Sequence, residues 1–154
     1  MKLSKRHLEK QIESFLAKYT PEMQKLARAA LAKMRKRLPN AVEMVYDNYN
    51  ALAFGFSPDE KPSNAILSIV LYPKYAALFF LQGAKLHDPH KRLQGSGSTV
   101  RNVRVDDAGI LDDPQIVALM GEALERAKVR MNPNRKRQLI IRSVSAKQRP
   151  RRPS

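Results

Sequence analysis

The tetrapeptide His87-Asp88-Pro89-His90 holds the side chains best suited to coordination chemistry in this chain. Two imidazoles three residues apart, with a carboxylate between them, can converge on one ion, and both ligand types suit iron and other transition metals. We therefore take His87, Asp88 and His90 as candidate metal ligands. The alternative is an ordinary surface turn, since Asp-Pro favours turns and the positive charges of Lys91 and Arg92 oppose cation binding.

A turn rich in glycine and serine follows this tetrapeptide. Backbone N–H groups in such a turn can form an anion-binding nest, and neighbouring cationic side chains can supply counter-charge. The alternative is a tight connection that needs glycine for a positive φ. The segment lacks the GxxxxGK[ST] pattern of a P-loop. The candidate anion-binding residues are Lys91, Arg92, Gly95, Ser96, Gly97, Ser98 and Arg101.

The net charge of +15 is concentrated at the two ends of the chain. Residues 1–40 carry 11 Lys or Arg against 3 acids, residues 126–154 carry 11 and no acid, and the segment between them has more acids than bases. The basic C-terminal segment, which extends beyond the last predicted helix, predicts salt-sensitive, sequence-independent binding of a polyanion such as nucleic acid. A solvated extension without function is the alternative. The candidate polyanion-binding residues are Arg135, Lys136, Arg137, Arg142, Lys147, Arg149, Arg151 and Arg152.

The sequence offers no catalytic constellation. It has no cysteine, which excludes a thiol nucleophile and a disulfide scaffold, and it lacks the GxSxG and HExxH motifs. Glu43 and Asp47 fall near the mouth of the first predicted hairpin, where Tyr46, Tyr49 and Tyr72 can line a pocket. Paired carboxylates can do acid–base work, but acids spaced by four at a strand end are usually exposed. We therefore expect a protein that is not an enzyme.

The elements that must position these residues begin with an N-terminal helical hairpin. Its helices are predicted from Ser4 to Lys18 and from Pro21 to Arg37, because Ser4 and Thr20 suit the N-cap position and the apolar residues recur with helical spacing. Asp113 and Pro114 give the same signal for a C-terminal helix that runs to Arg130. No stretch approaches the roughly 20 apolar residues of a membrane span, so we expect a soluble, cytoplasmic protein.

Five β-favouring runs separated by turn signals lie between these helices. Strands in hairpin order, bracketed by helices, predict an α+β fold with a mainly antiparallel five-stranded sheet packed on the helices. Residues 1–131 form one domain in this interpretation, and residues 132–154 a basic extension that is largely disordered from about Ser145. Leu139–Ile141 can add a short strand or pack on the domain. The predicted strands are Val42–Tyr46, Ala51–Phe56, Ala65–Tyr72, Tyr75–Leu81 and Thr99–Val105.

One stretch of the chain resembles a known family. The residues Phe79-Phe80-Leu81-Gln82-Gly83-Ala84-x-Leu86-x-Asp88-Pro89, followed by Leu93-x-Gly95-x-Gly97-x-x-x-Arg101, resemble the YdhG-like family, domain of unknown function 1801. The layout of residues 8–130 is similar as well. The family is classed as frataxin-like, and one branch is described as intracellular iron chaperones. A lysine is frequent after the second glycine of the family's turn, where this chain has Ser98.

The resemblance implies a small non-enzymatic domain with an antiparallel sheet on helices, and it makes iron the cofactor to consider first. We therefore expect a binding domain that holds a metal or a small ligand near the loop from His87 to Ser98. The alternative function is that of an accessory protein that binds nucleic acid or another polyanion through its basic C-terminal extension.

Overall fold

Three α-helices begin where the sequence places side-chain caps. The side chains of Ser4, Thr20 and Asp113 accept hydrogen bonds from backbone N–H groups in the first turns, and a proline opens the second and third helices. The structure, a computed structural model, describes residues 4–153. The third helix is one turn shorter than predicted. The helices are α1 (Lys5–Leu16), α2 (Pro21–Arg37) and α3 (Pro114–Arg126).

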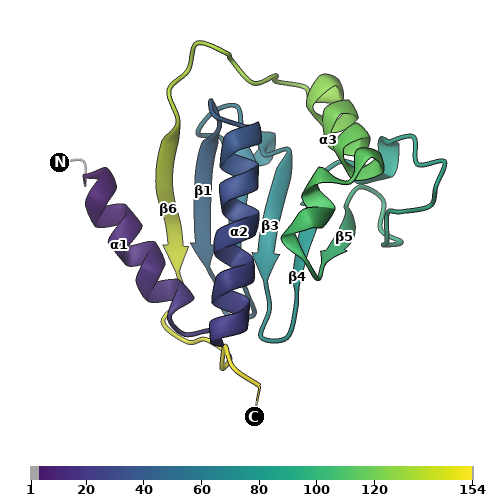
Figure 1. Ribbon diagram of the computed structural model, residues 1–154. Helices are drawn as coiled ribbons and strands as arrows, with labels where there is room; N and C mark the ends of the chain where they lie inside the picture. Colours follow the sequence, from purple (N-terminus) through teal and green to yellow (C-terminus); the bar gives the residue numbers. More distant parts are fainter. Residues whose placement is uncertain (1–3, 154) are drawn as a thin grey trace.

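The strands form one six-stranded mixed sheet in the order β5-β4-β3-β2-β1-β6 (Figure 1). The five predicted strands pair as antiparallel neighbours, which confirms the α+β class. The strands are β1 (Val42–Asp47), β2 (Leu52–Ser57), β3 (Leu67–Leu71), β4 (Ala76–Phe80), β5 (Arg101–Val105) and β6 (Gln138–Val144). Short 3₁₀ helices connect them: η1 (Pro62–Asn64), η2 (Gly83–Lys85) and η3 (Ala108–Asp112).

The predictions of a five-stranded sheet and of a disordered extension are wrong. The sixth strand, β6, comes from the basic extension and pairs in parallel with β1. Residues beyond it stay on the domain: the N–H groups of Ser145 and Arg149 donate to the carbonyl oxygens of Asp47 and Tyr49, at 2.8 and 2.9 Å. Composition alone suggested disorder here, but two arginines of the extension, Arg137 and Arg151, have buried acidic partners on β1.

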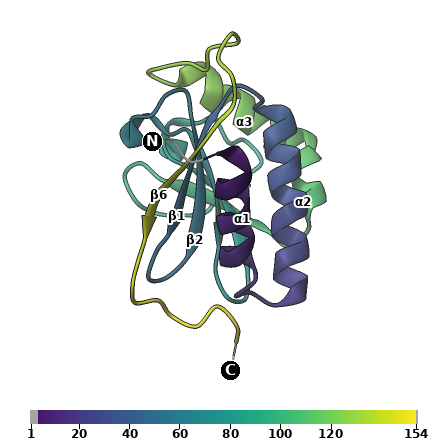
Figure 2. The ribbon, with the colours of Figure 1, turned by 90° about the vertical axis from the view of Figure 1, so that its left-hand side faces the viewer.

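Helices α1 and α2 lie on one face of the sheet (Figures 1 and 2). Alternate residues of the strands bury their side chains against them, among them Leu52, Phe54 and Phe56 of β2. Helix α3 adds Ile116 and Met120 to the same core. Within residues 4–153, no α-helix covers the opposite face of the sheet (Figure 2), and no helix is long and apolar enough to cross a membrane.

Candidate functional site

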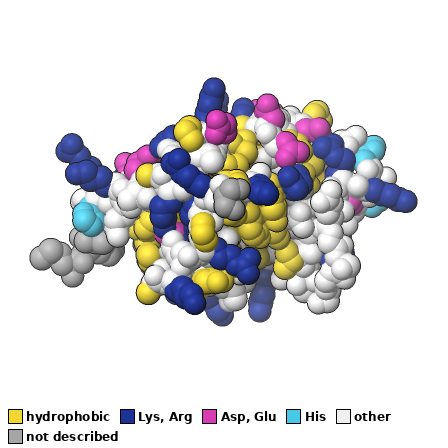
Figure 3. All heavy atoms as spheres, turned by 90° about the horizontal axis from the view of Figure 1, so that it is seen from below, with side chains coloured by type: hydrophobic (Ala, Val, Ile, Leu, Met, Phe, Trp, Pro, Cys, Tyr) yellow, Lys and Arg dark blue, Asp and Glu magenta, His cyan; other side chains and the backbone are white. Residues whose placement is uncertain are grey.

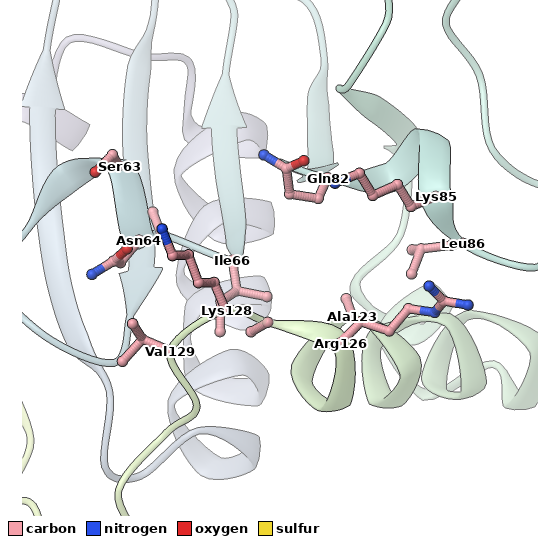
Figure 4. A pocket seen from close by; sticks show the side chains of 12 residues that line it. Ser63, Asn64, Ile66, Gln82, Lys85, Leu86, Ala123, Arg126, Lys128 and Val129 are labelled. Atoms are coloured by element: carbon pink, nitrogen blue, oxygen red, sulfur yellow. The ribbon is translucent and has the colours of Figure 1, made fainter.

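A cavity of about 430 Å³ lies between one end of the sheet and the C-terminal end of α3 (Figure 4). Three segments far apart in the sequence form it: η1 with the residues that lead into β3, η2 with its neighbours after β4, and the last turn of α3. Its volume falls in the range of small-molecule sites, roughly 300–1,000 Å³. The lining residues are Ser63, Asn64, Ala65, Ile66, Gln82, Lys85, Leu86, Ala123, Arg126, Ala127, Lys128 and Val129.

The lining of this cavity is apolar at its base and cationic at its rim. Ile66 is buried, and Leu86 is half-buried against the core. Lys85, Arg126 and Lys128 supply three positive charges, and the lining contains no acid. In Figure 4 the Lys128 side chain extends toward Asn64, and Gln82 and Lys85 lie across the cavity from it. An apolar base beneath a cationic rim suits a small molecule that has a hydrocarbon body and an anionic group.

Gly83 lets the chain place Lys85 at this rim. A Cβ atom on Gly83 would lie 2.5 Å from the Cβ atom and 3.0 Å from the backbone nitrogen of Arg101, so only glycine lets η2 approach β5 this closely. The hydrogen bond from the Ala84 N–H to the Thr99 carbonyl, at 2.9 Å, fixes the approach. The glycine of the Gln-Gly-Ala motif is therefore a packing requirement that orients the cavity wall.

Glu122 connects α3 to the start of the loop from His87 to Val100, which we call the histidine loop. It accepts a hydrogen bond of 3.0 Å from the His87 N–H and pairs with the Nε of Arg126 at 2.8 Å. Arg126 is therefore partly neutralised. Within residues 4–153, Lys85 and Lys128 have no acidic group within 4 Å. These two lysines are the cations of the rim that can meet a ligand without giving up an ion pair.

The candidate metal ligands line a separate cavity of about 380 Å³ on the other side of Glu122. His87 and His90 are exposed. Both carboxylate oxygens of Asp88 accept backbone hydrogen bonds, from the N–H groups of Arg92 at 2.9 Å and Leu93 at 2.8 Å. Asp88 thus stabilises the turn. The structure brings no three His, Asp or Glu side chains into a metal-holding group anywhere in residues 4–153.

The glycine–serine turn projects into solvent, with Gln94 to Val100 exposed throughout. Arg101 donates from Nη1 to the carbonyl oxygens of Gly97 and Val100, at 2.6 and 2.8 Å. The turn therefore presents carbonyls to a cation of its own chain, which differs from the N–H groups of an anion nest.

The remaining anion-binding candidates are not gathered with Arg101. Arg92 is bonded to α3 through Asp113 at 3.2 Å and Gln115 at 2.8 Å, and Lys91 is exposed, with φ of 51°. Ser96 and Ser98 are exposed as well. No common ligand position unites these candidates in the structure.

Two cations of the extension are paired with acids of β1. Glu43 binds Arg35 at 2.7 Å and Arg137 at 3.4 Å. Asp47 binds Lys18 at 2.6 Å and Arg151 at 2.9 Å. Both acids are buried, so the expectation that they are exposed is wrong.

The other cations of the extension divide into two groups. Arg135 bonds Gln138, and Arg152 donates to carbonyls at the end of α1. The other four are exposed, and within the described chain their side chains have neither an acid within 4 Å nor a hydrogen bond: Lys136, Arg142, Lys147 and Arg149.

Comparison with protein-family models, with curated protein sequences and with solved structures gives no match to this chain. The resemblance to the YdhG-like family therefore stays a prediction.

Sequence reasoning missed Asn64, Arg126 and Lys128 of the cavity. Asn64 lies before β3 and the other two lie at the end of α3, and only the fold brings them beside Lys85 and Leu86. The one local signal was the Gln-Gly-Ala stretch of residues 82–84, which opens the histidine loop.

Proposed function

We propose that this protein is a non-enzymatic binding domain for a small amphipathic anion, a carboxylate or phosphate on a hydrocarbon body. The ligand occupies the cavity between η1, η2 and the end of α3. The observation that carries this proposal is the lining itself, with Lys85, Arg126 and Lys128 around an apolar base and no acid. A charge-assisted hydrogen bond to an anion is about twice as strong as a neutral one.

An anionic ligand has better support than a metal ion, the other ligand class that the sequence suggests. The three cations of the rim would repel a metal ion placed in this cavity. At the histidine loop, the Asp88 carboxylate already accepts two backbone hydrogen bonds. Iron binding in the manner implied by the family resemblance would need ligands beyond His87 and His90.

Calorimetric titration with octanoate and with phenyl phosphate tests this function. The double variant Lys85→Ala/Lys128→Ala removes the two cations that lack acidic partners and leaves the apolar base intact. Losing two partly exposed charge contacts should weaken binding about tenfold, which corresponds to about 1.4 kcal/mol.

The matched control is Lys10→Ala/Lys25→Ala, which lowers the net charge equally at exposed positions of α1 and α2. It should leave both affinities unchanged. Equal weakening by the two double variants would mean that the anions sense only the net charge. Tight binding of ferrous iron, lost in His87→Ala/His90→Ala, would favour the metal site instead.

A further inference from the structure

The uncovered face of the sheet carries a second surface at the opposite end of the strands. A groove of about 930 Å³ lies between the β1–β2 turn, the β3–β4 turn and the C-terminal segment. Its lining holds three tyrosines and two cations, and no acid. The lining residues are Asn48, Tyr49, Asn50, Ala51, Ala53, Val70, Tyr72, Pro73, Lys74, Tyr75, Arg149 and Pro150.

The floor of this groove follows from the register of the sheet. Tyr46, Ala53, Val70, Ala77 and Arg104 pair in one row from β1 to β5, and directly paired residues share a face. The three central side chains are small, whereas the two at the ends are large. The row spans about 19 Å at roughly 4.8 Å between strands. Its members Ala53 and Val70 line the groove, so the groove and the row together form a shallow trough long enough for several nucleotides.

The tyrosines of the groove are arranged for stacking. The rings of Tyr72 and Tyr75 stack with centroids 4.6 Å apart and an interplanar angle of 21°. Arg104 lies over Tyr75 at 4.2 Å, and Arg149 over Tyr49 at 5.5 Å. Within the described chain, Tyr72 and Tyr49 each have only one such stacking partner. A ring has two faces, so both can accept a further planar group.

Positive charge surrounds these rings. Lys74 and Arg149 line the groove, and Arg104 stands at the end of the row, in a chain whose net charge is +15. Arg104 also pairs with the exposed Asp106 at 3.6 Å, a surface ion pair that contributes little and that a phosphate can replace. Figure 3, which views this end of the molecule, shows hydrophobic side chains across the middle, Lys and Arg around them, and Asp and Glu mostly toward one side. Aromatic side chains on which bases stack, beside cations that follow a phosphate backbone, are the two components of single-strand recognition.

We infer that this trough binds single-stranded nucleic acid, with bases stacked on Tyr72 and Tyr49 and phosphates held by Lys74, Arg104 and Arg149. The basic extension therefore contributes one arginine to a built surface, where the sequence predicted a free arm. A duplex keeps its bases stacked on each other, so it cannot use the tyrosines. Binding at this end is independent of the anion cavity, which lies at the other end of the strands.

Fluorescence anisotropy with labelled 12-mers of oligo-uridine and oligo-deoxythymidine tests the inference. Because stacking contributes roughly 1–3 kcal/mol per base, Tyr49→Ala/Tyr72→Ala should weaken binding at least tenfold. Tyr49→Phe/Tyr72→Phe keeps both rings and should bind like the wild type. A 12-base-pair duplex should bind less tightly than either single strand, and the two single strands together show whether the sugar matters.

The cations are tested through the dependence of affinity on salt. Three phosphate contacts predict a slope of about −2 in a plot of log K against log salt concentration, at roughly −0.7 per contact for single strands. Arg149→Ala should reduce the magnitude of this slope by about 0.7, whereas Lys10→Ala, at an exposed position of α1, should leave it unchanged.

Three results would overturn the inference. One is affinity for duplex equal to that for single strands together with no effect of Tyr49→Ala/Tyr72→Ala, which would indicate electrostatic attraction alone. Another is binding of phosphatidylserine vesicles or polyglutamate without binding of the oligonucleotides, which would assign the surface to a membrane or to an acidic protein. The third is no binding of either 12-mer at 50 mM salt. Circular dichroism of each variant shows that the fold is kept.

Discussion

The C-terminal segment and the histidine loop look equally exposed in the sequence, yet the structure treats them differently. Residues 138–144 form strand β6, and residues 145–153 follow it along the domain. Arg151, in this last part, is only 3% exposed. Residues 94–100 are exposed throughout, although they hold the Gly-x-Gly part of the stretch that resembles a family. The difference lies in partners. Each buried acid of β1 pairs with an arginine near the C-terminus, Glu43 with Arg137 and Asp47 with Arg151. Within the described chain the loop has no buried acid to pair with, and the carbonyl oxygens of its exposed tip accept hydrogen bonds from the neighbouring Arg101. A run of like charge therefore does not by itself indicate a free arm.

Removing Arg151 should produce the largest change in stability. Its Nη2 lies 2.9 Å from Asp47, whose side chain is fully buried, and it also donates to the Asn48 carbonyl. Among the described residues 4–153, Arg151→Ala leaves Asp47 with Lys18 as its ionic partner. Breaking a buried pair typically costs 3–5 kcal/mol, and we expect about 3 kcal/mol because Lys18 stays. Urea unfolding followed by circular dichroism measures the difference.

Arg152→Ala is the matched control for this prediction. Arg152 is exposed and bonds only the carbonyl oxygens of Ala17 and Lys18, at 3.3 Å. Its removal should change the free energy of unfolding by no more than about 0.5 kcal/mol. If the two variants lose the same stability, the segment is attached by its backbone alone and the buried ion pair adds nothing.

Tyr19 tests the buried surroundings of Arg151, which lies over the Tyr19 ring at 5.9 Å from its centroid. Burial raises the pKa of Tyr19 to about 12, and the hydroxyl donates to the Leu71 carbonyl at 2.9 Å. Between pH 10 and pH 12 the unfolded tyrosine loses its proton while the folded one keeps it. Stability should therefore fall as the pH rises, by up to about 1.4 kcal/mol per unit.

Urea unfolding of the wild type and of Tyr19→Phe at pH 9, 10 and 11 isolates this effect from the titration of lysines. The variant should start about 1 kcal/mol less stable at pH 9, because the Leu71 carbonyl loses its donor. Its decline with pH should be shallower than that of the wild type. Parallel declines would mean that Tyr19 ionises as readily in the folded state as in the unfolded one.

Local signals in the sequence predicted most of the fold. The caps at Ser4, Thr20 and Asp113 and the hairpin order of five strands depend on neighbours in the chain, so they can be read directly. For Leu139–Ile141 the sequence left two alternatives, a short strand or packing on the domain, and the structure shows the strand, β6. Its parallel partner is β1, and the segment after it is held by the pairing of Arg151 with Asp47, which are 104 residues apart. Composition cannot show that a distant acid is buried.

The same reason limits what the sequence predicts of the sites. Lys85 and Leu86 fall in the stretch that resembles the YdhG-like family. Asn64 and Lys128 of the same cavity come from other segments. The sequence predicted that Tyr46, Tyr49 and Tyr72 can line a pocket near the first hairpin; Tyr49 and Tyr72 line the groove, and Tyr46 does not. The arginine over Tyr49 comes from the extension, in which the sequence shows no aromatic residue for stacking.

Two glycines in the exposed loop test whether its backbone is free to change conformation. Gly95 has φ of +121°, and a Cβ atom there would lie 3.3 Å from the Val100 carbonyl oxygen. Gly97 has no positive φ, and a Cβ atom would meet nothing within 4 Å. Gly95→Ala should therefore cost about 1–2 kcal/mol in urea unfolding. Gly97→Ala should be neutral or slightly stabilising, because alanine restricts the unfolded chain more than glycine does.

Together the two glycine variants separate two accounts of the loop. If only Gly95 is sensitive, one constrained position, beside the bridge between Gln94 and Asn102, sets the path of the loop, and the rest is solvated chain. If Gly97→Ala lowers the free energy of unfolding as much as Gly95→Ala, the turn is packed around a bound group that does not belong to the chain. The anion nest would then be the better account, because a bound ion would leave no room for the added methyl group.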